Sequence, residues 1–273
     1  MALQGTLISG RYRVVRPFAR GANSVVYLVF DPEGRPYVLK LLPPALESRV
    51  NREYQLAHTW KHPLINPVLE RLTIENQPGL LLDYAPGEVL SRVFAAQDGH
   101  TALERGTERR QDFLKVLIQL LEALAYIHEH GVVHRDLKPE NVMVTPDYSI
   151  RLIDFDLSGP VGEVFEERIA MGTAGYMAPE QALGNPSTPA TDLYSLGVLM
   201  YWALSGQLPF YGTLPEVMRQ HVSSAPVPPH QVRGSSVDSL DALCLMLLRK
   251  NPSERIGNAL VLRGMLGDQL EHS

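Results

Sequence analysis

The sequence predicts an α+β protein with two lobes, a small antiparallel β-rich lobe followed by a larger helical lobe. Up to about residue 85, runs rich in valine and aromatic residues alternate with turn signals such as Asp31-Pro32-Glu33-Gly34. Beyond residue 88, apolar residues recur at helical spacing, as in 113–128. Pro86-Gly87 interrupts the chain between these patterns, so we place the lobes at 1–84 and 85–273, together as one domain.

The individual elements follow from the same patterns. Valine- and aromatic-rich runs predict strands at 11–18, 24–30, 36–42 and 80–82. A helix is expected over 48–60, ended by Lys61-His62-Pro63. In the second lobe, helical spacing predicts helices at 113–128, 191–205, 214–222, 237–249 and 259–270. The charged, turn-rich stretch 97–110 is expected to be a solvated loop.

Composition narrows the possible partners and compartments. With 45% hydrophobic residues the chain can bury a substantial core, and a net charge of −5 gives no sign of a nucleic-acid partner. One cysteine, Cys244 in an apolar run, allows no internal disulfide and is expected to be a buried hydrophobe. The most apolar stretch, 193–204, is too short to span a bilayer and predicts a buried core helix. We therefore expect a cytoplasmic protein, or the cytosolic portion of a longer one, with no membrane segment in this chain.

One short stretch carries most of the chemistry, His134-Arg135-Asp136-Leu137-Lys138-Pro139-Glu140-Asn141. It places a carboxylate, an ammonium and a carboxamide within six positions. Phosphoryl transfer needs these groups, because the carboxylate accepts a hydroxyl proton, the cation steadies the moving phosphate and the amide oxygen holds a metal. The stretch also matches the catalytic-loop signature of protein kinases, H-R-D-L-x-x-x-N, at every fixed position.

Four further segments resemble protein-kinase motifs in the expected order. Tyr37-Val38-Leu39-Lys40 resembles V-A-I-K, and Glu53 lies on the following helix where the family places the partner of that lysine. Ile153-Asp154-Phe155-Asp156 resembles D-F-G, and Ala178-Pro179-Glu180 resembles A-P-E. The similarity runs from about residue 12 to 255 and is greatest to the bacterial branch of the eukaryotic-like (Hanks-type) Ser/Thr protein kinases. It implies the bilobal protein-kinase-like fold, with ATP bound by the N-terminal lobe.

The resemblance also implies roles for these residues. Lys40 would contact the α- and β-phosphates of ATP, fixed in place by Glu53. Asp136 would accept the hydroxyl proton, Lys138 would stabilise charge on the transferring group, and Thr173 would orient both. Mg²⁺, or alternatively Mn²⁺, would be held by Asn141 and Asp154.

The nucleotide contacts are assigned in the same way. The segment 19–26 corresponds to the glycine-rich loop but keeps only its middle glycine, Gly21, so it should be stiffer and bind phosphate less well. On this segment alone, an ordinary hairpin turn is the favoured alternative. The residues expected around the nucleotide are Gly21, Ser24, Val26, Val38, Lys40, Leu82, Asp83, Ala85 and Met143.

Other residues correspond to structural positions of the family. Asp192 would brace the catalytic-loop backbone, and Arg255 would pair with Glu180. His134 is expected to be structural, with Phe155 packed near it. His128 and His130, which lack the spacing of a zinc motif, are expected to be solvated at a helix end.

Asp156 is the clearest departure from the family pattern. The family has glycine there, which reaches positive φ freely and helps the segment flip. Aspartate tolerates left-handed backbone less well. We therefore expect Asp156 to bias the segment toward one state, and a Phe155 swung out into the nucleotide cleft would contradict this.

The segment 154–180 contains only three hydroxyl residues, Ser158, Thr173 and Tyr176. Many relatives carry phosphothreonines there that pair with the arginine matching Arg135. Glu166 or Glu167 could supply the negative charge instead, giving activity without loop phosphorylation. That these glutamates, with Glu163, are merely solvated is an equally open alternative.

Taken together, these residues predict a Ser/Thr protein kinase that transfers the γ-phosphoryl group of Mg-ATP to protein substrates and to itself. A pseudokinase, acting as a nucleotide-binding or scaffolding module, is the main alternative, supported by the reduced glycine loop and Asp156. A kinase for small molecules is disfavoured because 172–180 resembles a peptide-docking segment. The sequence leaves the oligomeric state open.

Overall fold

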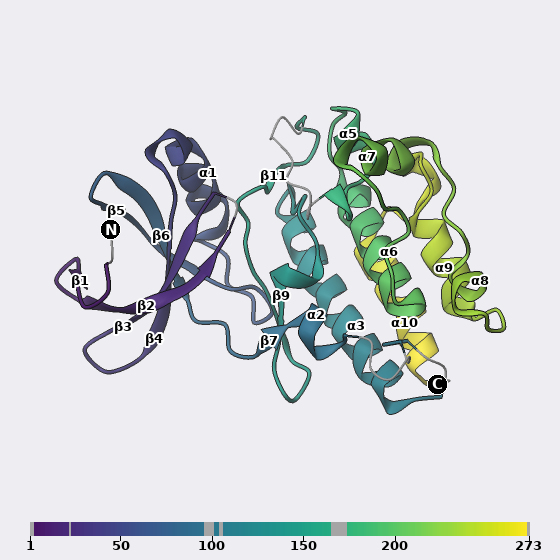
Figure 1. The fold of residues 1–273 in the computed structure, drawn as a ribbon, viewed down its shortest axis with the longest axis horizontal. Coiled ribbons are helices and arrows are strands. Elements are labelled where there is room, and N and C mark those ends of the chain that lie inside the picture. The colour runs from purple at the N-terminus through teal and green to yellow at the C-terminus, as the bar shows by residue number, and fades with distance from the viewer. Residues whose placement is uncertain (1–2, 22, 96–100, 104–105, 165–173, 272–273) are drawn as a thin grey trace. The chain divides into compact units, whose positions relative to one another are not determined.

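A computed structural model describes residues 3–21, 23–95, 101–103, 106–164 and 174–271. The chain forms two compact units, drawn in Figure 1. The first unit consists of Met1–Pro86 together with Asp154–Leu157, and the second of Gly87–Ile153 together with Ser158–Ser273. The sequence-based division is a single cut at 84/85. Asp154–Leu157 joins the first unit from much later in the chain because its side chains bind residues of that unit.

The first unit contains an antiparallel sheet in the order β1-β2-β3-β4-β6-β5. Its strands are β1 (Leu7–Ile8), β2 (Tyr12–Arg20), β3 (Val25–Phe30), β4 (Pro36–Leu41), β5 (Val68–Ile74) and β6 (Gln77–Asp83). The four predicted strands are confirmed as β2, β3, β4 and β6. Sequence analysis missed β5. Its signal was the two-residue turn Glu75-Asn76, whose φ angles of 49° and 64° suit a tight hairpin.

The two faces of this sheet differ in burial. Alternate residues, among them Tyr27, Val29 and Leu39, enter a buried core. The residues between them, such as Val26 and Val38, remain half-buried on the opposite face. Helix α1 (Glu47–Ala57) follows a short 3₁₀ helix (Pro44–Leu46) and packs against β5 and β6. It lies within the predicted 48–60, except that it begins one residue earlier and ends sooner.

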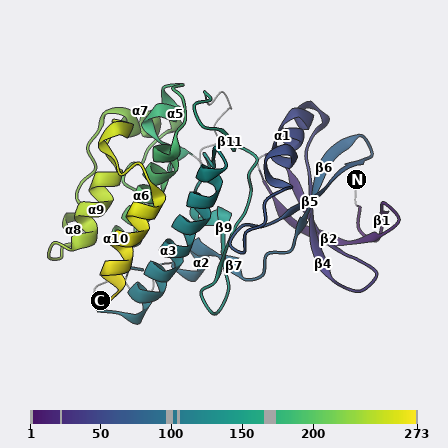
Figure 2. The same ribbon diagram turned by 180° about the vertical axis from the view of Figure 1, so that it is seen from behind.

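The second unit is mainly helical. Its helices are α2 (Leu90–Val93), α3 (Glu108–Glu129), α5 (Pro179–Ala182), α6 (Pro189–Ser205), α7 (Leu214–Ser223), α8 (Pro229–Arg233), α9 (Ser239–Leu247) and α10 (Ala259–Glu271). The five predicted helices are confirmed as α3, α6, α7, α9 and α10. Figure 2 shows α3 and α10 side by side, and α6 packs against α9. With the sheet of the first unit, these helices confirm the predicted α+β class.

Short strands complete the second unit. One small sheet has the order β10-β9-β7, formed by Ile150–Leu152, Val142–Val144 and Glu88–Val89. A second pairs β8 (Val132–Val133) with β11 (Gly159–Pro160). Single-turn 3₁₀ helices occupy Pro139–Asn141 and Pro252–Glu254. The residues between β8 and β9 form the loop that carries the catalytic-loop signature.

Helix α6 forms the centre of the second unit, as predicted for its apolar stretch. Nearly all of its residues are buried, and Gly197 lets α9 approach because a Cβ there would lie 2.7 Å from the Leu247 Cβ. Cys244 on α9 is fully buried, as expected, and its thiol lies 3.3 Å from the Gly197 carbonyl oxygen. Among the helices that the structure describes, none is both long and apolar enough to cross a membrane.

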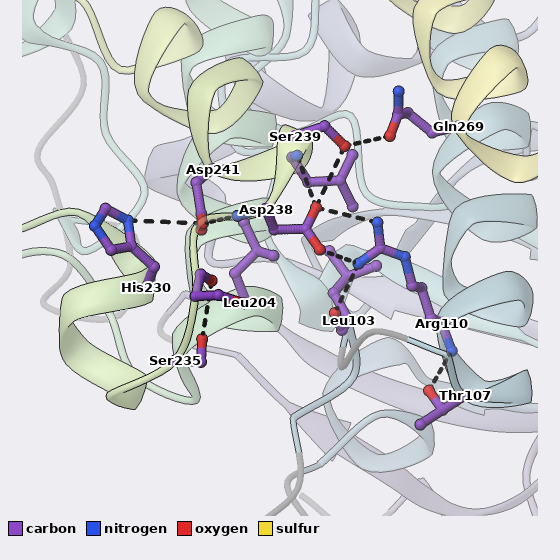
Figure 3. A network of polar contacts seen from close by, with 12 residues as sticks. Leu103, Thr107, Arg110, Leu204, His230, Ser235, Asp238, Ser239, Asp241 and Gln269 are labelled. Atoms are coloured by element: carbon purple, nitrogen blue, oxygen red, sulfur yellow. Dashed lines mark hydrogen bonds and ion pairs between the residues drawn. The ribbon is translucent and has the colours of Figure 1, made fainter. Parts of the chain in front are cut away.

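A buried ion-pair network holds α3, α8 and α9 together (Figure 3). Arg110 donates to both carboxylate oxygens of Asp238 at 2.7 and 3.1 Å, and Asp238 caps α9 by accepting from the Leu240 N–H at 2.9 Å. Asp241 accepts from the Asp238 N–H at 2.7 Å and from Arg233 at 3.0 and 2.9 Å. The prediction of a solvated loop is therefore wrong for Arg110, which is buried because α3 begins earlier than expected.

His221 on α7 makes the stability of the second unit depend on pH. It is fully buried, lies 2.9 Å from the Tyr194 hydroxyl through Nδ1, and packs edge-on against Phe210. Burial, with the nearby Lys250 ammonium, lowers its pKa from 6.5 to about 3. The imidazole is thus neutral in the folded protein at pH values where the unfolded chain binds a proton.

We expect the free energy of unfolding to fall as the pH drops below 6.5, by up to about 1.4 kcal/mol per pH unit from His221 alone. Denaturant unfolding at pH 7, 6 and 5 measures this dependence. His221→Gln should be less stable at pH 7 but should lose less stability on acidification. Parallel pH dependences for the two proteins would contradict the prediction.

Candidate active site

The first unit brings three predicted site residues together around Lys40. Lys40 is the penultimate residue of β4 and lies on the half-buried face of the sheet. Its Nζ donates to the Glu53 Oε2 of α1 at 2.8 Å. The same Nζ lies 2.6 Å from the Oδ1 of Asp154. The strand, the helix and the segment 154–157 therefore each contribute one charged group to one cluster.

Two carboxylates keep Lys40 charged although it is buried. Burial by itself lowers the pKa of Lys40, but the charges of Asp154 and then Glu53 outweigh it and raise the pKa above its ordinary value. The Asp154 side chain is 39% exposed, whereas that of Glu53 is 1% exposed. Asp154 is therefore the carboxylate of this cluster that is open to an incoming ligand.

Glu53 also binds the backbone next to Asp154. Its Oε1 accepts from the Phe155 N–H at 3.3 Å, and Asp154 adopts positive φ, 64°. The Phe155 ring is buried and packs edge-on against Trp60, with ring centroids 5.0 Å apart. The ring is therefore held against Trp60 within the first unit. Its expected position near His134 concerns two different units and stays a prediction.

The apolar residues predicted to contact a nucleotide lie on the same half-buried face of the sheet. Val26 on β3 is opposite Lys40, and Val38 on β4 is opposite Leu82 on β6. Their half-buried side chains provide an apolar surface next to the buried cation. At the β2–β3 turn, the Gly21 N–H donates to the Ser24 carbonyl oxygen at 2.9 Å.

Asp83, Ala85 and Met143, the remaining predicted nucleotide contacts, lie outside this group of apolar sheet residues. The Asp83 carboxylate is 3.3 Å from Arg35, and its carbonyl oxygen accepts from Asn66 at 3.0 Å. Ala85 is half-buried after β6. Met143 belongs to the second unit, where it is half-buried on β9.

The second unit brings Asp136, Lys138 and Asn141 together in the loop between β8 and β9. Lys138 Nζ donates to the Asp136 Oδ2 at 2.6 Å. Asn141 Nδ2 donates to the same oxygen at 3.1 Å and to the Asp136 carbonyl at 2.8 Å. This orientation directs the amide nitrogen of Asn141 toward Asp136 and its oxygen to the other side. Asp136 is thus a carboxylate held by a cation and an amide.

Asp192 holds the backbone of this loop from α6. Its carboxylate accepts from the N–H groups of His134 and Arg135, each at 2.9 Å, which confirms the predicted brace. The His128 Nε2 lies 2.8 Å from the same carboxylate. Burial raises the pKa of the Asp192 carboxyl, but the hydrogen bond and charge of His128 outweigh it, so the pKa lies below its ordinary value. The expectation of a solvated His128 is wrong, because the end of α3 is buried on the side facing α6.

His134 is structural, as predicted. It is fully buried, and its Nδ1 accepts from the Asp136 N–H at 3.3 Å. Its carbonyl oxygen accepts from the Ser158 hydroxyl at 3.2 Å. The ring therefore supports the loop that presents Asp136.

Arg135 points to the segment after β11. It donates to the Glu163 Oε2 at 2.8 Å and to the Pro160 carbonyl oxygen at 2.9 Å. Gly159 permits this arrangement, since a Cβ there would collide with the Arg135 guanidinium and the Glu163 carboxylate. Glu163 therefore supplies a negative charge to Arg135. Glu166, Glu167 and Thr173 lie outside the described residues, so the expectations for them stay predictions.

The comparison with known families agrees with this geometry. A family model described as protein kinase domain matches residues 12–265. The chain belongs to this family. The predicted bilobal protein-kinase fold is thereby confirmed.

Among curated proteins, the kinase domain is similar to serine/threonine-protein kinases of bacteria. It is 32% identical to PknB of Mycolicibacterium smegmatis, covering 95% of this chain and 43% of that protein. It is 34% identical to pkn2 of Myxococcus xanthus, covering 93% of this chain and 32% of that protein. The chain thus spans less than half the length of these relatives.

A buried ion pair supports the A-P-E segment of the kinase domain. Arg255 donates to both oxygens of Glu180 at 2.7 and 2.8 Å, as predicted, and Glu180 also accepts from the Thr191 hydroxyl at 2.9 Å. Gln181 donates to the Arg135 carbonyl oxygen at 2.9 Å. The A-P-E segment is thereby connected to the catalytic loop within the second unit.

One contact in the kinase domain was not found from the sequence. Arg49 on α1 donates to both carboxylate oxygens of Asp156, through Nε and Nη2, with Nε 2.9 Å from Oδ1. The available signal was its spacing, because Arg49 precedes Glu53 by four residues and such residues share a helix face. Sequence analysis assigned the Asp156 side chain no partner.

Proposed function

We propose that this kinase domain transfers the γ-phosphoryl group of ATP to Ser or Thr hydroxyls of proteins, including its own. The observation that carries the proposal is that the residues named from the motifs form two charged clusters, Lys40 with Glu53 and Asp154 in the first unit, and Asp136 with Lys138 in the second. The printed names of its relatives, serine/threonine-protein kinases, support the choice of hydroxyl. The proposal concerns this domain, since the relatives are longer proteins.

The first unit would bind the nucleotide. The half-buried surface of Val26, Val38 and Leu82 suits the faces of an adenine ring, and the charged Lys40 suits the α- and β-phosphates. Gly21 and Ser24 would approach the phosphates through the β2–β3 turn. Asp83 and Ala85 would line the same adenine site, and Met143 of the second unit stays a predicted nucleotide contact.

The donors also fit Mg²⁺. Hard oxygen ligands suit this ion, which is usually bound by one or two carboxylates and the substrate phosphates. Asp154 offers a partly exposed carboxylate and Asn141 an amide oxygen directed away from Asp136. Among the residues that the structure describes, no group of three or more His, Cys, Asp and Glu side chains forms a metal site. When bound, Mg²⁺ would neutralise charge on the phosphates.

The second unit would handle the substrate hydroxyl. Asp136 accepts the proton as the hydroxyl oxygen attacks the γ-phosphorus and the bond to the β-phosphate oxygen breaks. Lys138, 2.6 Å from Asp136, stabilises negative charge on the transferring group. Thr173 would orient both side chains through its hydroxyl.

The test is transfer of labelled γ-phosphate from Mg-ATP to the protein and to myelin basic protein, beside Asp154→Asn. Label on Ser or Thr that disappears in the variant is the expected result. A folded wild type that binds ATP but transfers no label would establish the pseudokinase alternative instead.

Activity without phosphorylation of the 154–180 segment is a separate prediction, carried by the Arg135–Glu163 pair. Glu163→Gln should lower kcat about tenfold. This factor is at the low end of the contribution of a hydrogen bond to a charged group, because the Glu163 side chain is 43% exposed. Steady-state kinetics on protein shown by mass spectrometry to carry no phosphate measures the effect.

Glu129→Gln, an exposed carboxylate on α3, is the matched control. Unchanged kinetics in Glu163→Gln would show that its charge is not needed. An inactive unphosphorylated wild type that becomes active after phosphorylation would also contradict the prediction.

A further inference from the structure

Arg49 and Asp156 form a charge pair within the first unit that the general phosphoryl-transfer machinery does not require. Asp156 is the residue for which the D-F-G motif has glycine, and glycine has no carboxylate to offer Arg49. The pair is bidentate, which is the strongest geometry for an arginine and a carboxylate. Its side chains are 11% and 15% exposed, so solvent screens the pair only weakly.

The Arg49–Asp156 pair lies next to the cluster of Lys40, Glu53 and Asp154, and it joins helix α1 to the segment 154–157. Glu53 on α1 binds the Phe155 N–H and, through Lys40, the Asp154 carboxylate. Arg49, one helical turn earlier on α1, binds Asp156. Helix α1 therefore binds Phe155 and Asp156 directly, and it reaches Asp154 through Lys40 of β4.

The backbone at Asp156 does not require a glycine. Asp154 has positive φ, 64°, whereas Asp156 is not among the residues with positive φ. A side chain at 156 therefore adds no left-handed strain. The lower tolerance of aspartate for left-handed backbone, considered from the sequence, does not apply in this structure. The expected bias toward one state can instead come from the salt bridge, with Phe155 buried against Trp60.

We propose that Arg49 is a positioning residue, which acts through Asp156 to hold Asp154 and helix α1 in the arrangement that keeps Lys40 between its two carboxylates. The proposal rests on the proposed function where catalytic rate is the readout. The glycine found at this place in the motif gives the segment freedom to leave that arrangement. Here the carboxylate and Arg49 restrain it.

A double-mutant cycle tests the coupling. Arg49→Gln and Asp156→Gly should each lower kcat about tenfold, and the double variant should be no worse than either, because each single change already breaks the pair. Arg49→Lys keeps the charge but loses the bidentate geometry, and should recover part of the loss. Multiplicative losses in the double variant would overturn the proposal, since Arg49 would then act independently of Asp156.

Glu47→Gln is the matched control. Glu47 also lies on α1 and pairs with an arginine, Arg71 of β5, but its side chain is 56% exposed and the pair leaves residues 154–157 untouched. Kinetic constants of this variant should stay within about twofold of wild type. Circular dichroism and thermal melts of each variant separate misfolding from a loss of positioning.

A second readout does not depend on catalysis. The chain has two tryptophans, so in a Trp202→Phe background Trp60 alone reports the packing of Phe155. Acrylamide should quench Trp60 more strongly in Asp156→Gly and Arg49→Gln than in the Glu47→Gln control, because the freed segment uncovers the indole. Equal quenching in all folded variants would overturn the proposal. If no variant transfers phosphate, this measurement still decides the inference, while the proposed function alone fails.

Discussion

Asp136→Asn should reduce kcat by about 10²- to 10⁴-fold, the usual contribution of a positioned general base. The substitution keeps the shape of the side chain but replaces the carboxylate with a neutral amide, which is too weak a base to accept the proton. It also removes the negative charge that faces the Lys138 ammonium at 2.6 Å. ATP affinity should change little, because the groups proposed to hold the phosphates belong to the first unit. Initial rates over a range of ATP concentrations, together with ATP binding by calorimetry, separate the two effects.

Asp147→Asn is the control for this variant. Asp147 is an exposed carboxylate in the turn between β9 and β10, and accepts hydrogen bonds from Thr145 and Ser149. Its loss should leave kcat unchanged. A kcat within tenfold of wild type in Asp136→Asn would contradict the role of Asp136 as the base.

Arg255→Gln should destabilise the kinase domain by about 3–5 kcal/mol, which corresponds to a fall in Tm of roughly 10 °C. The Arg255 guanidinium is fully buried, and besides Glu180 it donates to the carbonyl oxygens of Arg249, Ala190 and Lys250. Removing it leaves the Glu180 carboxylate charged and buried, with the Thr191 hydroxyl as its remaining partner among the contacts described. Thermal and denaturant unfolding measure the loss.

Two variants distinguish this loss from a general effect of removing arginine. Arg249→Gln, on an exposed side chain nearby, should change stability by less than about 0.5 kcal/mol. The double variant Arg255→Met with Glu180→Met should recover part of the loss, since no unpaired charge remains. A loss of less than about 1 kcal/mol in the free energy of unfolding of Arg255→Gln would contradict the prediction, because solvent would then compensate for the missing guanidinium.

The sequence alone was sufficient for the fold class and the family, and it named the charged residues that the structure groups around Lys40 and around Asp136. Strands β2, β3, β4 and β6 and the five long helices were predicted because hydrophobic periodicity reports local geometry directly. Asp136, Lys138 and Asn141 were predicted because their spacing in one short loop is already their spatial arrangement. Roles taken from motifs, such as the brace by Asp192 and the Arg255–Glu180 pair, were confirmed by the hydrogen bonds of the structure.

The tertiary structure decided which partner each remaining charged residue has. Arg110 and His128 look solvated in a charged stretch or at a helix end, yet both are buried against carboxylates from distant elements. Arg49 and Asp156 are separated by more than one hundred positions, and no local pattern relates them. The physical reason is that periodicity and motif spacing describe neighbours along the chain. An ion pair forms only where folding brings two charges together and removes them from water.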